Sequence, residues 1–281
     1  MTERQRTEKS IHAFGQYLSG EEREPATIEK YLRDVRGFLC WLKGRPVAKE
    51  RAAEWKESLH QKGCGPATIN GKLSALNKWF AFLGRMDCRL KYLKIQRKLF
   101  RSAAKELTKQ DYTRLLETAY SLGRERLALL METMCATGIR VSEVKYMTVE
   151  VVQAGRADIA LKGKIRTILI PGKLCRKLQK YARKRKIASG EIFLTRSGKG
   201  LGRRQIWAEM KSLCKKAGVE ATKVFPHNLR HLFARTFYRA CRDVAKLADV
   251  LGHSSMETTR LYLISTGAEH ARQLERLGLI C

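Results

Sequence analysis

The sequence has too few acidic residues to balance its basic ones. Its 281 residues include 27 Asp and Glu against 57 Lys and Arg, which gives a formal net charge of +30. Such an excess is larger than solubility requires and indicates a polyanionic partner. Because the basic residues are spread along the chain rather than gathered in one tail or amphipathic helix, nucleic acid is favoured over a membrane surface. Basic structural proteins carry similar charge, so composition predicts nucleic-acid binding without predicting catalysis.

The sequence also lacks cysteines at the spacings that metal sites and disulfide frameworks need. Its eight cysteines are far apart and form no Cys-x-x-Cys pair. They are Cys40, Cys64, Cys88, Cys135, Cys175, Cys214, Cys241 and Cys281. This pattern predicts reduced thiols rather than metal ligands or disulfides.

Long hydrophobic runs are missing as well. The richest apolar stretch, residues 127–136, is interrupted by Glu132, and a membrane-spanning helix needs about 20 apolar residues. The opening residues, MTERQRTEKSIHAF, contain no apolar core of the kind that signal peptides have. We therefore expect a cytoplasmic protein that does not associate with membranes. The apolar content of 44% is sufficient for buried cores.

Apolar residues recur at helical spacing through the first part of the chain. This period predicts helices over residues 7–18, 26–42, 48–61 and 67–83. We expect an all-helical domain over residues 1–85. Residues 86–104 lose the period and are rich in Lys and Arg, which indicates a basic linker.

The remaining residues, 105–281, have a mixed pattern. Thr108 is a candidate N-cap for one helix, and a second helix is expected over residues 123–137. The segment RADIALKGKIRTILI alternates polar and apolar positions around a Lys-Gly-Lys turn, which predicts a β-hairpin. Residues 192–195 indicate a further strand or an extended segment, and helices follow. The second domain is therefore expected to be mainly helical with a small antiparallel β-sheet.

Three segments of this second domain carry side chains suited to binding a phosphodiester. In the first, ATGIRVSEV, Gly138 is expected to end one helix, and Thr137 or Ser142 to cap the next. Arg140 would then lie near a helix N-terminus, where backbone N–H groups also face an anion. Arginine binds phosphate bidentately and keeps its charge. Glu143, on the same face, is expected to orient Arg140 or to pair with a lysine.

The second segment, FPHNLRHLFAR, places His227 and Arg230 one helical turn apart, after Pro226 at a helix start. A histidine beside an arginine-bound phosphate can act as a general base near neutral pH. His231 is expected to point elsewhere on the helix and to be structural. An isolated His-x-x-Arg pattern is a weak signal, so this segment indicates a phosphodiester site only together with the other two segments.

The third segment is LGHSSMETTRLYL. Gly252 is expected to end a helix, His253 to lie in the turn, and Ser254 or Ser255 to cap the next helix. Tyr262 follows nine residues after His253. A phenol is a good nucleophile only where positive charge and hydrogen bonds favour its ionised form, and two arginines at a shared phosphate supply that charge. Alone, Tyr262 would be interpreted as a packing residue.

Together and in this order, TGIRVSEV, HNLRH and LGHSSMETTRLY closely resemble the catalytic signature of the tyrosine recombinases, the phage integrase family. The match rests on the order of Arg, His-x-x-Arg, Leu-Gly-His and Tyr, and on the 23-residue distance from Arg230 to His253. It covers most of residues 105–265. The N-terminal helices, with PATIEKYLRDVRGFLCWL, resemble the SAM-like core-binding domain of the same family. The resemblance implies a mainly α protein whose catalytic domain has the DNA breaking-rejoining enzyme fold.

The resemblance also implies a reaction, site-specific DNA recombination or integration, that uses neither metal nor cofactor. Tyr262 would attack the scissile phosphate, leaving a 3′-phosphotyrosyl link and a free 5′-hydroxyl. Arg140 and Arg230 would bind the non-bridging oxygens. His227 would assist deprotonation of the tyrosine, and His253 would donate to the phosphate. A 5′-hydroxyl from a partner duplex would reverse the step and exchange strands.

The family hairpin carries a lysine that protonates the leaving oxygen, and here the sequence departs from the pattern. The family usually has GKGNK, whereas LKGKIRTILIP is about one residue shorter and leaves Lys162 and Lys164 at the turn. We prefer Lys162 because it precedes the glycine, as in the family. Residues two apart on a strand face the same side, so alternation does not separate the two lysines. Either could instead contact only backbone phosphate.

The implied partners are double-stranded DNA, held in a C-shaped clamp, and three further copies of the chain in a tetrameric synapse, with an accessory DNA-bending protein as another candidate. The C-terminal AEHARQLERLGLIC has an apolar stripe of Ala268, Ala271, Leu274 and Leu277. This stripe would pack into a neighbouring protomer or fold back on its own domain. The alternative functions are a type IB topoisomerase and a catalytically silent DNA-binding relative. The intact set of arginines, histidines and tyrosine argues against the silent relative.

Overall fold

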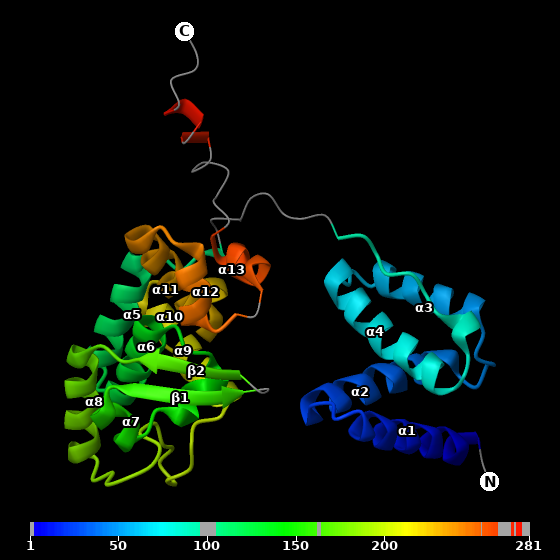
Figure 1. Cartoon of the computed structure of the whole chain (residues 1–281), viewed down its shortest axis with the longest axis horizontal. Coiled ribbons are helices and arrows are strands. Elements are labelled where there is room, and N and C mark those ends of the chain that lie inside the picture. Colours follow the sequence, from blue (N-terminus) through cyan, green and yellow to red (C-terminus); the bar gives the residue numbers. More distant parts are fainter. Residues whose placement is uncertain are drawn as a thin grey trace. The chain divides into compact units, whose positions relative to one another are not determined.

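The computed structural model describes residues 3–95, 105–161, 164–253, 255–263, 271–272 and 274–276. The chain divides into two compact units, Met1–Arg97 and Lys98–Cys281, and each is described by itself (Figure 1). The expected domain limits at residues 85 and 105 stay predictions. Within the described residues, no helix is both long enough and apolar enough to cross a membrane.

Unit 1 contains four α-helices among its described residues. They are α1 (Glu3–Gly20), α2 (Pro25–Leu42), α3 (Lys49–Gln61) and α4 (Pro66–Phe82), followed by a short 3-10 helix, η1 (Met86–Cys88). The helices confirm the four that apolar periodicity predicts. Pro25 and Pro66 begin α2 and α4, where the missing proline N–H would have had no partner within the helix.

An aromatic cluster forms the centre of unit 1. The ring of Phe38 on α2 lies edge-on to Trp55, Trp79 and Phe80 at centroid distances of 5.3, 6.3 and 6.1 Å. All four side chains are buried. Edge-to-face packing adds to the burial of large apolar surfaces, so these rings hold α2, α3 and α4 together.

Two asparagines on α4 hold the chain as it leaves unit 1. The side chain of Asn77 donates to the Leu90 carbonyl and accepts from the Leu90 N–H, both at 2.9 Å. Asn70 makes the same two bonds with Leu93, at 2.9 and 2.8 Å. Each side-chain amide thus pairs with the backbone N–H and C=O of one residue, as a neighbouring strand does in a sheet. The first part of the predicted linker therefore lies against α4 at Leu90 and Leu93.

Unit 2 is mainly helical and has one small sheet among its described residues. Its elements are α5 (Lys109–Ser121), α6 (Glu125–Thr137), η3 (Val141–Tyr146), α7 (Val149–Ala154), β1 (Arg156–Leu161), β2 (Lys164–Leu169), α8 (Gly172–Lys184), α9 (Arg203–Lys211), α10 (Cys214–Ala217), η4 (Ala221–Lys223), α11 (Pro226–Cys241), α12 (Val244–Leu251) and α13 (Met256–Leu263).

The core of unit 2 is built around α6, which packs against α5, α8 and α11. The predicted N-cap of α5 is confirmed, because the Thr108 hydroxyl accepts from the Asp111 N–H at 3.0 Å. The Asp111 carboxylate in turn accepts from the Thr108 N–H at 3.1 Å. Helix α6 ends at Gly138, whose φ of +64° confirms the predicted break. This break sets the direction of the chain that carries Arg140.

The predicted hairpin is confirmed, since β1 and β2 pair antiparallel with Ile159 opposite Arg166 and Leu161 opposite Lys164. Residues 162 and 163 join the strands and lie outside the described residues, as does the side chain of Lys164. Ile168 is buried, and Arg166 lies on the same face of β2 because side chains alternate along a strand. The hairpin therefore directs one charged side chain into unit 2.

Residues 192–195, expected as a strand or an extended segment, form no strand of the sheet, and the chain bends at residues 192 and 193. Isolated bridges join Glu191, just before this segment, to Thr148, and Leu194, within it, to Gly200. Further along the chain, α12 contacts both β2 and α13, and Figure 1 shows α12 and α13 next to each other. A small core that includes Ala234, Leu247 and Tyr262 joins α11, α12 and α13.

Candidate active site

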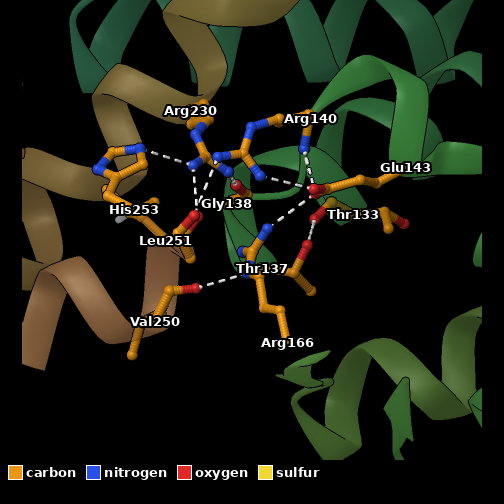
Figure 2. Close-up of polar contacts among 11 residues, drawn as sticks. Thr133, Thr137, Gly138, Arg140, Glu143, Arg166, Arg230, Val250, Leu251 and His253 are labelled. Atoms are coloured by element: carbon orange, nitrogen blue, oxygen red, sulfur yellow. Dashed lines mark hydrogen bonds and ion pairs between the residues drawn. The ribbon is translucent and has the colours of Figure 1, made fainter. Parts of the chain in front are cut away.

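The C-terminal end of α12 gathers three arginine side chains from three different elements (Figure 2). They bind three consecutive backbone carbonyls: Arg166 Nε donates to Val250 at 3.0 Å, Arg230 Nη2 to Leu251 at 2.7 Å, and Arg140 Nη2 to Gly252 at 3.2 Å. The last carbonyls of a helix have no partner within it and carry partial negative charge. The helix end therefore compensates charges that would otherwise repel each other.

Arg230 is the most enclosed of the three, with 1% of its surface exposed. Its Nη1 donates to the carbonyl of Gly138, which ends α6, while its Nη2 binds the end of α12 and lies 3.0 Å from His253 Nε2. Burial, followed by the charge of Arg140, lowers the pKa of Arg230 to about 10, so the guanidinium stays charged at neutral pH. Two helix ends thus fix a buried cation beside His253.

A buried carboxylate holds the other two arginines. The Glu143 side chain is 1% exposed and accepts from Arg140 Nη1 and Arg166 Nη1, each at 2.8 Å. Burial raises the pKa of Glu143, but the hydrogen bonds from Arg140 and the charge of Arg166 outweigh it and leave the pKa lowered. Glu143 is thus shared by two guanidinium groups, and Arg230 adds a third charge, so the site keeps an excess of positive charge. An anion such as phosphate is the ligand that this excess favours.

The cap of η3 differs from the prediction. Neither Thr137 nor Ser142 is the N-cap residue, because Arg140 occupies that position. The Thr137 hydroxyl instead donates to the Thr133 carbonyl inside α6 at 2.6 Å, and the Arg140 N–H donates to the Glu143 carboxylate at 2.7 Å. A charged acceptor three residues into the turn makes a capping hydroxyl unnecessary. Glu143 therefore pairs with arginines rather than with a lysine.

His253 lies in the turn after α12, as expected, and both of its ring nitrogens have partners. Nε2 is 3.0 Å from Arg230 Nη2, and Nδ1 is 2.9 Å from the hydroxyl of Thr259 on α13. Thr259 is fully buried. Burial, and then the charge of Arg230, lowers the pKa of His253 to about 4. The imidazole is thus neutral at physiological pH.

Tyr262 on α13 lies among three imidazole rings and a guanidinium. Its ring centroid is 4.3 Å from that of His231, 5.2 Å from His253 and 5.5 Å from His227. The guanidinium carbon of Arg230 is 6.0 Å from the tyrosine ring centroid. Tyr262 itself is 6% exposed. The structure therefore brings a phenol, three imidazole rings and a buried cation into one cluster.

Five of the six predicted site residues lie in or beside this cluster, and the sixth, Lys162, lies outside the described residues. Arg140 joins it through the Gly252 carbonyl, one residue before His253. His227 is exposed at the start of α11, whereas Arg230, one turn later, is buried. Helix α11 thus presents an accessible histidine and a fixed arginine, and both lie beside the Tyr262 ring.

His231 is where the sequence interpretation was wrong, because its ring contacts the site rather than pointing away. It lies 4.5 Å from His227 and 4.3 Å from Tyr262. Residues four apart on a helix are neighbours, so His227 and His231 share a face and the spacing was a usable signal. Arg166 and Thr259 were also missed. Thr259 precedes Tyr262 by one helical turn, but Arg166 comes from the hairpin and no local spacing connects it to the other arginines.

Gly252 has a conformation and surroundings that disfavour a side chain. Its φ is +61°, and a Cβ there would lie 2.4 Å from Arg166 Cδ. We expect Gly252→Ala to lower the free energy of unfolding, with about 1–3 kcal/mol from backbone strain alone, and to slow any chemistry that depends on Arg166. Gly155→Ala is the matched control, because Gly155 also has a positive φ, of +71°, but no atom within 4 Å of its Cβ position. Equal losses of stability and activity in the two variants, measured by denaturant unfolding and by strand cleavage, would contradict this view of Gly252.

Within the part of the chain that the structure describes, no group of three or more His, Cys, Asp or Glu side chains could hold a metal ion. The site's described charged groups are arginines and one carboxylate already bound to them.

Two family models match this chain. The model of the phage integrase family matches residues 105–269, which include every site residue named above. The model of the phage integrase N-terminal SAM-like domain matches residues 11–86, which contain most of the helical bundle of unit 1.

Similar proteins match over most of their length. Tyrosine recombinase XerA of Thermococcus kodakarensis is 31% identical over 272 residues, which cover 94% of this chain and 93% of that protein. Tyrosine recombinase XerD of Brucella suis biovar 1 is 29% identical over 287 residues, which cover 92% and 93%.

Solved structures with a similar fold include protein–DNA complexes. A lambda integrase tetramer bound to a Holliday junction has a TM-score of 0.72 at 18% identity, covering 91% of this chain and 76% of that one. The Tn1549 transposon integrase in complex with circular intermediate DNA has a TM-score of 0.69 at 17% identity, covering 96% and 99%. At these identities the likeness shows a shared fold.

Proposed function

The chain belongs to the phage integrase family and is a site-specific tyrosine recombinase that cleaves and rejoins DNA, and we propose that Tyr262 is the nucleophile of this reaction. The observation that supports this most is the cluster around its ring, with three imidazoles within 5.5 Å between centroids and the buried Arg230 at 6.0 Å. Positive charge stabilises an ionised phenol, and a neighbouring imidazole can accept its proton.

Arg140 and Arg230 bind the non-bridging oxygens of the scissile phosphate in this proposal. The Arg140 side chain is 39% exposed, so it can reach a ligand, while Glu143 limits its freedom. Arg230 is held by two helix ends and does not need to reorganise. The phosphate gains negative charge as a fifth oxygen approaches, so fixed cations favour the transition state over the ground state.

The bond changes follow from these positions. The Tyr262 oxygen forms a bond to phosphorus while the bond from phosphorus to the 5′-oxygen breaks, which leaves a 3′-phosphotyrosyl link and a 5′-hydroxyl. The exposed His227 accepts the phenolic proton, and His231 packs against both rings and orients them. His253 donates from Nε2 to a phosphate oxygen.

The reverse reaction explains strand exchange. Because the phosphodiester bond is replaced by a phosphotyrosyl bond of similar energy, a 5′-hydroxyl from a second duplex can attack it without an external energy source. Exchange between two duplexes breaks four strands, and a site with one nucleophile per chain then requires four protomers. We therefore propose a homotetramer on two double-stranded DNA sites in the cytoplasm, aided by an accessory DNA-bending protein.

A hairpin lysine completes the proposed chemistry. We expect Lys162→Ala to slow cleavage by about 10²–10⁴-fold, the usual contribution of general acid catalysis, and Lys164→Ala to slow it much less. A substrate with sulfur in place of the bridging 5′-oxygen separates the roles, because a thiolate leaves without being protonated. On that substrate Lys162→Ala should cleave at the wild-type rate. Rescue of Lys164→Ala instead would assign the role to Lys164.

The direct test of the proposed function is a nicked suicide duplex with candidate attachment sequence from the native locus. After cleavage, the short fragment that carries the new 5′-hydroxyl dissociates. Rejoining is then prevented, and the protein stays trapped on the DNA. We expect an adduct that survives a denaturing gel and forms equally well with EDTA. Duplex binding with no adduct on any locus sequence would instead support a catalytically silent relative.

A further inference from the structure

The hydrogen bonds of His253 select one of its two neutral tautomers. A guanidinium has N–H donors and no acceptor, so Nε2, 3.0 Å from Arg230 Nη2, must be the accepting nitrogen. The ring proton of a neutral imidazole then lies on Nδ1 and is donated to the Thr259 hydroxyl at 2.9 Å. The lowered pKa of His253, about 4, agrees with a neutral ring.

This tautomer cannot perform the role proposed for His253. Nδ1 is directed toward the buried Thr259, and Nε2 is directed toward Arg230, which binds the phosphate in the proposed function. A donor to the phosphate must therefore be Nε2–H, which the arrangement without a bound phosphate does not provide. When a phosphate oxygen accepts the Arg230 Nη2 hydrogen bond in place of His253 Nε2, the ring has to change tautomer.

A hydroxyl suits both tautomers, because it accepts one hydrogen bond and donates another. The Thr259 oxygen accepts from Nδ1–H in the free site and can donate its own proton to Nδ1 once that nitrogen is deprotonated. His253 is only partly buried, so solvent can supply a proton to Nε2 and accept the one that Nδ1 loses. The ring is neutral before and after this exchange.

We propose that Thr259 is a positioning residue that allows His253 to change from the Nδ1–H to the Nε2–H tautomer when a phosphate enters the site. The proposal rests on the proposed function, since it takes Tyr262 as the nucleophile and His253 as a phosphate donor. Thr259 also lies one turn before Tyr262 on α13, so its bond to His253 links the nucleophile's helix to the turn after α12.

The variants Thr259→Val and Thr259→Ser test this role in the full chain. Valine keeps the shape of threonine and removes the hydroxyl, whereas serine keeps the hydroxyl and removes a methyl group. We expect Thr259→Val to slow adduct formation on the suicide duplex by about 10- to 100-fold, the effect of one hydrogen bond to a reacting group. Thr259→Ser should stay within about threefold of the wild type, and both variants should bind the duplex normally.

Nitrogen-15 NMR of the histidine rings gives a readout that packing alone would not change. In the free protein the His253 signals should show a protonated Nδ1 and an unprotonated Nε2. In Tyr262→Phe bound to an intact duplex the protonated nitrogen should be Nε2, and adding Thr259→Val should prevent that change. A free protein with Nε2 protonated, or a DNA complex with both nitrogens protonated, would overturn the proposal.

Different outcomes test the proposed function and the role of Thr259. If Tyr262→Phe still forms an adduct, the proposed function is wrong. If Tyr262→Phe is inert but Thr259→Val cleaves as fast as the wild type, only the role of Thr259 is wrong. Equal losses in Thr259→Val and Thr259→Ser would also overturn it, because the hydroxyl would then not be the group that matters.

Discussion

Tyr262→Phe is expected to abolish the covalent protein–DNA adduct, by at least about 10⁴-fold in rate, and to leave duplex affinity within a few fold of the wild type. The change removes one oxygen and keeps a ring that is 6% exposed and packs against His231, so the fold should persist. Adduct formation is measured on a denaturing gel with the suicide duplex, and affinity by equilibrium binding to the intact duplex.

Tyr238→Phe is the matched control, because Tyr238 is a partly buried residue that packs against the same small core. It should form the adduct at the wild-type rate. A Tyr262→Phe protein that no longer binds DNA would show that the tyrosine is structural. An adduct of normal yield would show that another residue is the nucleophile.

Glu143→Ala is expected to cause the largest loss of stability, about 3–5 kcal/mol in the free energy of unfolding. Removing this carboxylate leaves Arg140 and the largely buried Arg166 without their shared counter-ion. Because folding lowers the pKa of Glu143, its stabilisation is present above the unfolded-state pKa and is lost as the pH falls through the folded-state pKa. Denaturant unfolding near neutral pH therefore measures the full effect.

Glu132→Ala is the control for this prediction. Glu132 pairs with Lys177 at 2.6 Å, but the lysine side chain is 41% exposed. Pairs of this kind contribute roughly 0–1 kcal/mol, so the control should lose little stability and no cleavage activity. If the Glu143 and Glu132 variants were equally stable, the buried carboxylate would not be what holds the arginines.

Local patterns predicted much of the fold. Apolar periodicity identified the helices of unit 1, and Thr108 and Gly138 behaved as a helix cap and a helix end because both effects act within a few residues. The hairpin followed from alternation around its turn. The motif order identified the family, since Arg140, Arg230, His253 and Tyr262 occur at characteristic distances along the chain.

What the sequence could not predict depends on contacts between distant segments. Three consecutive carbonyls at the end of α12 bind arginines from the turn after α6, from β2 and from α11. No spacing along the chain encodes that meeting, so Arg166 went unnoticed. The cap assigned to Thr137 or Ser142 was wrong for a related reason. A buried Glu143, stabilised by the remote Arg166, takes the place of the hydroxyl.

The identity of the residue joined to DNA is the most direct test of this account. Digestion of the suicide-duplex adduct with trypsin should leave the DNA on the peptide LYLISTGAEHAR, residues 261–272, which contains a single tyrosine. We expect mass spectrometry to find the link on Tyr262, through a 3′-phosphate. A link to any other tyrosine, or through a 5′-phosphate, would contradict the account.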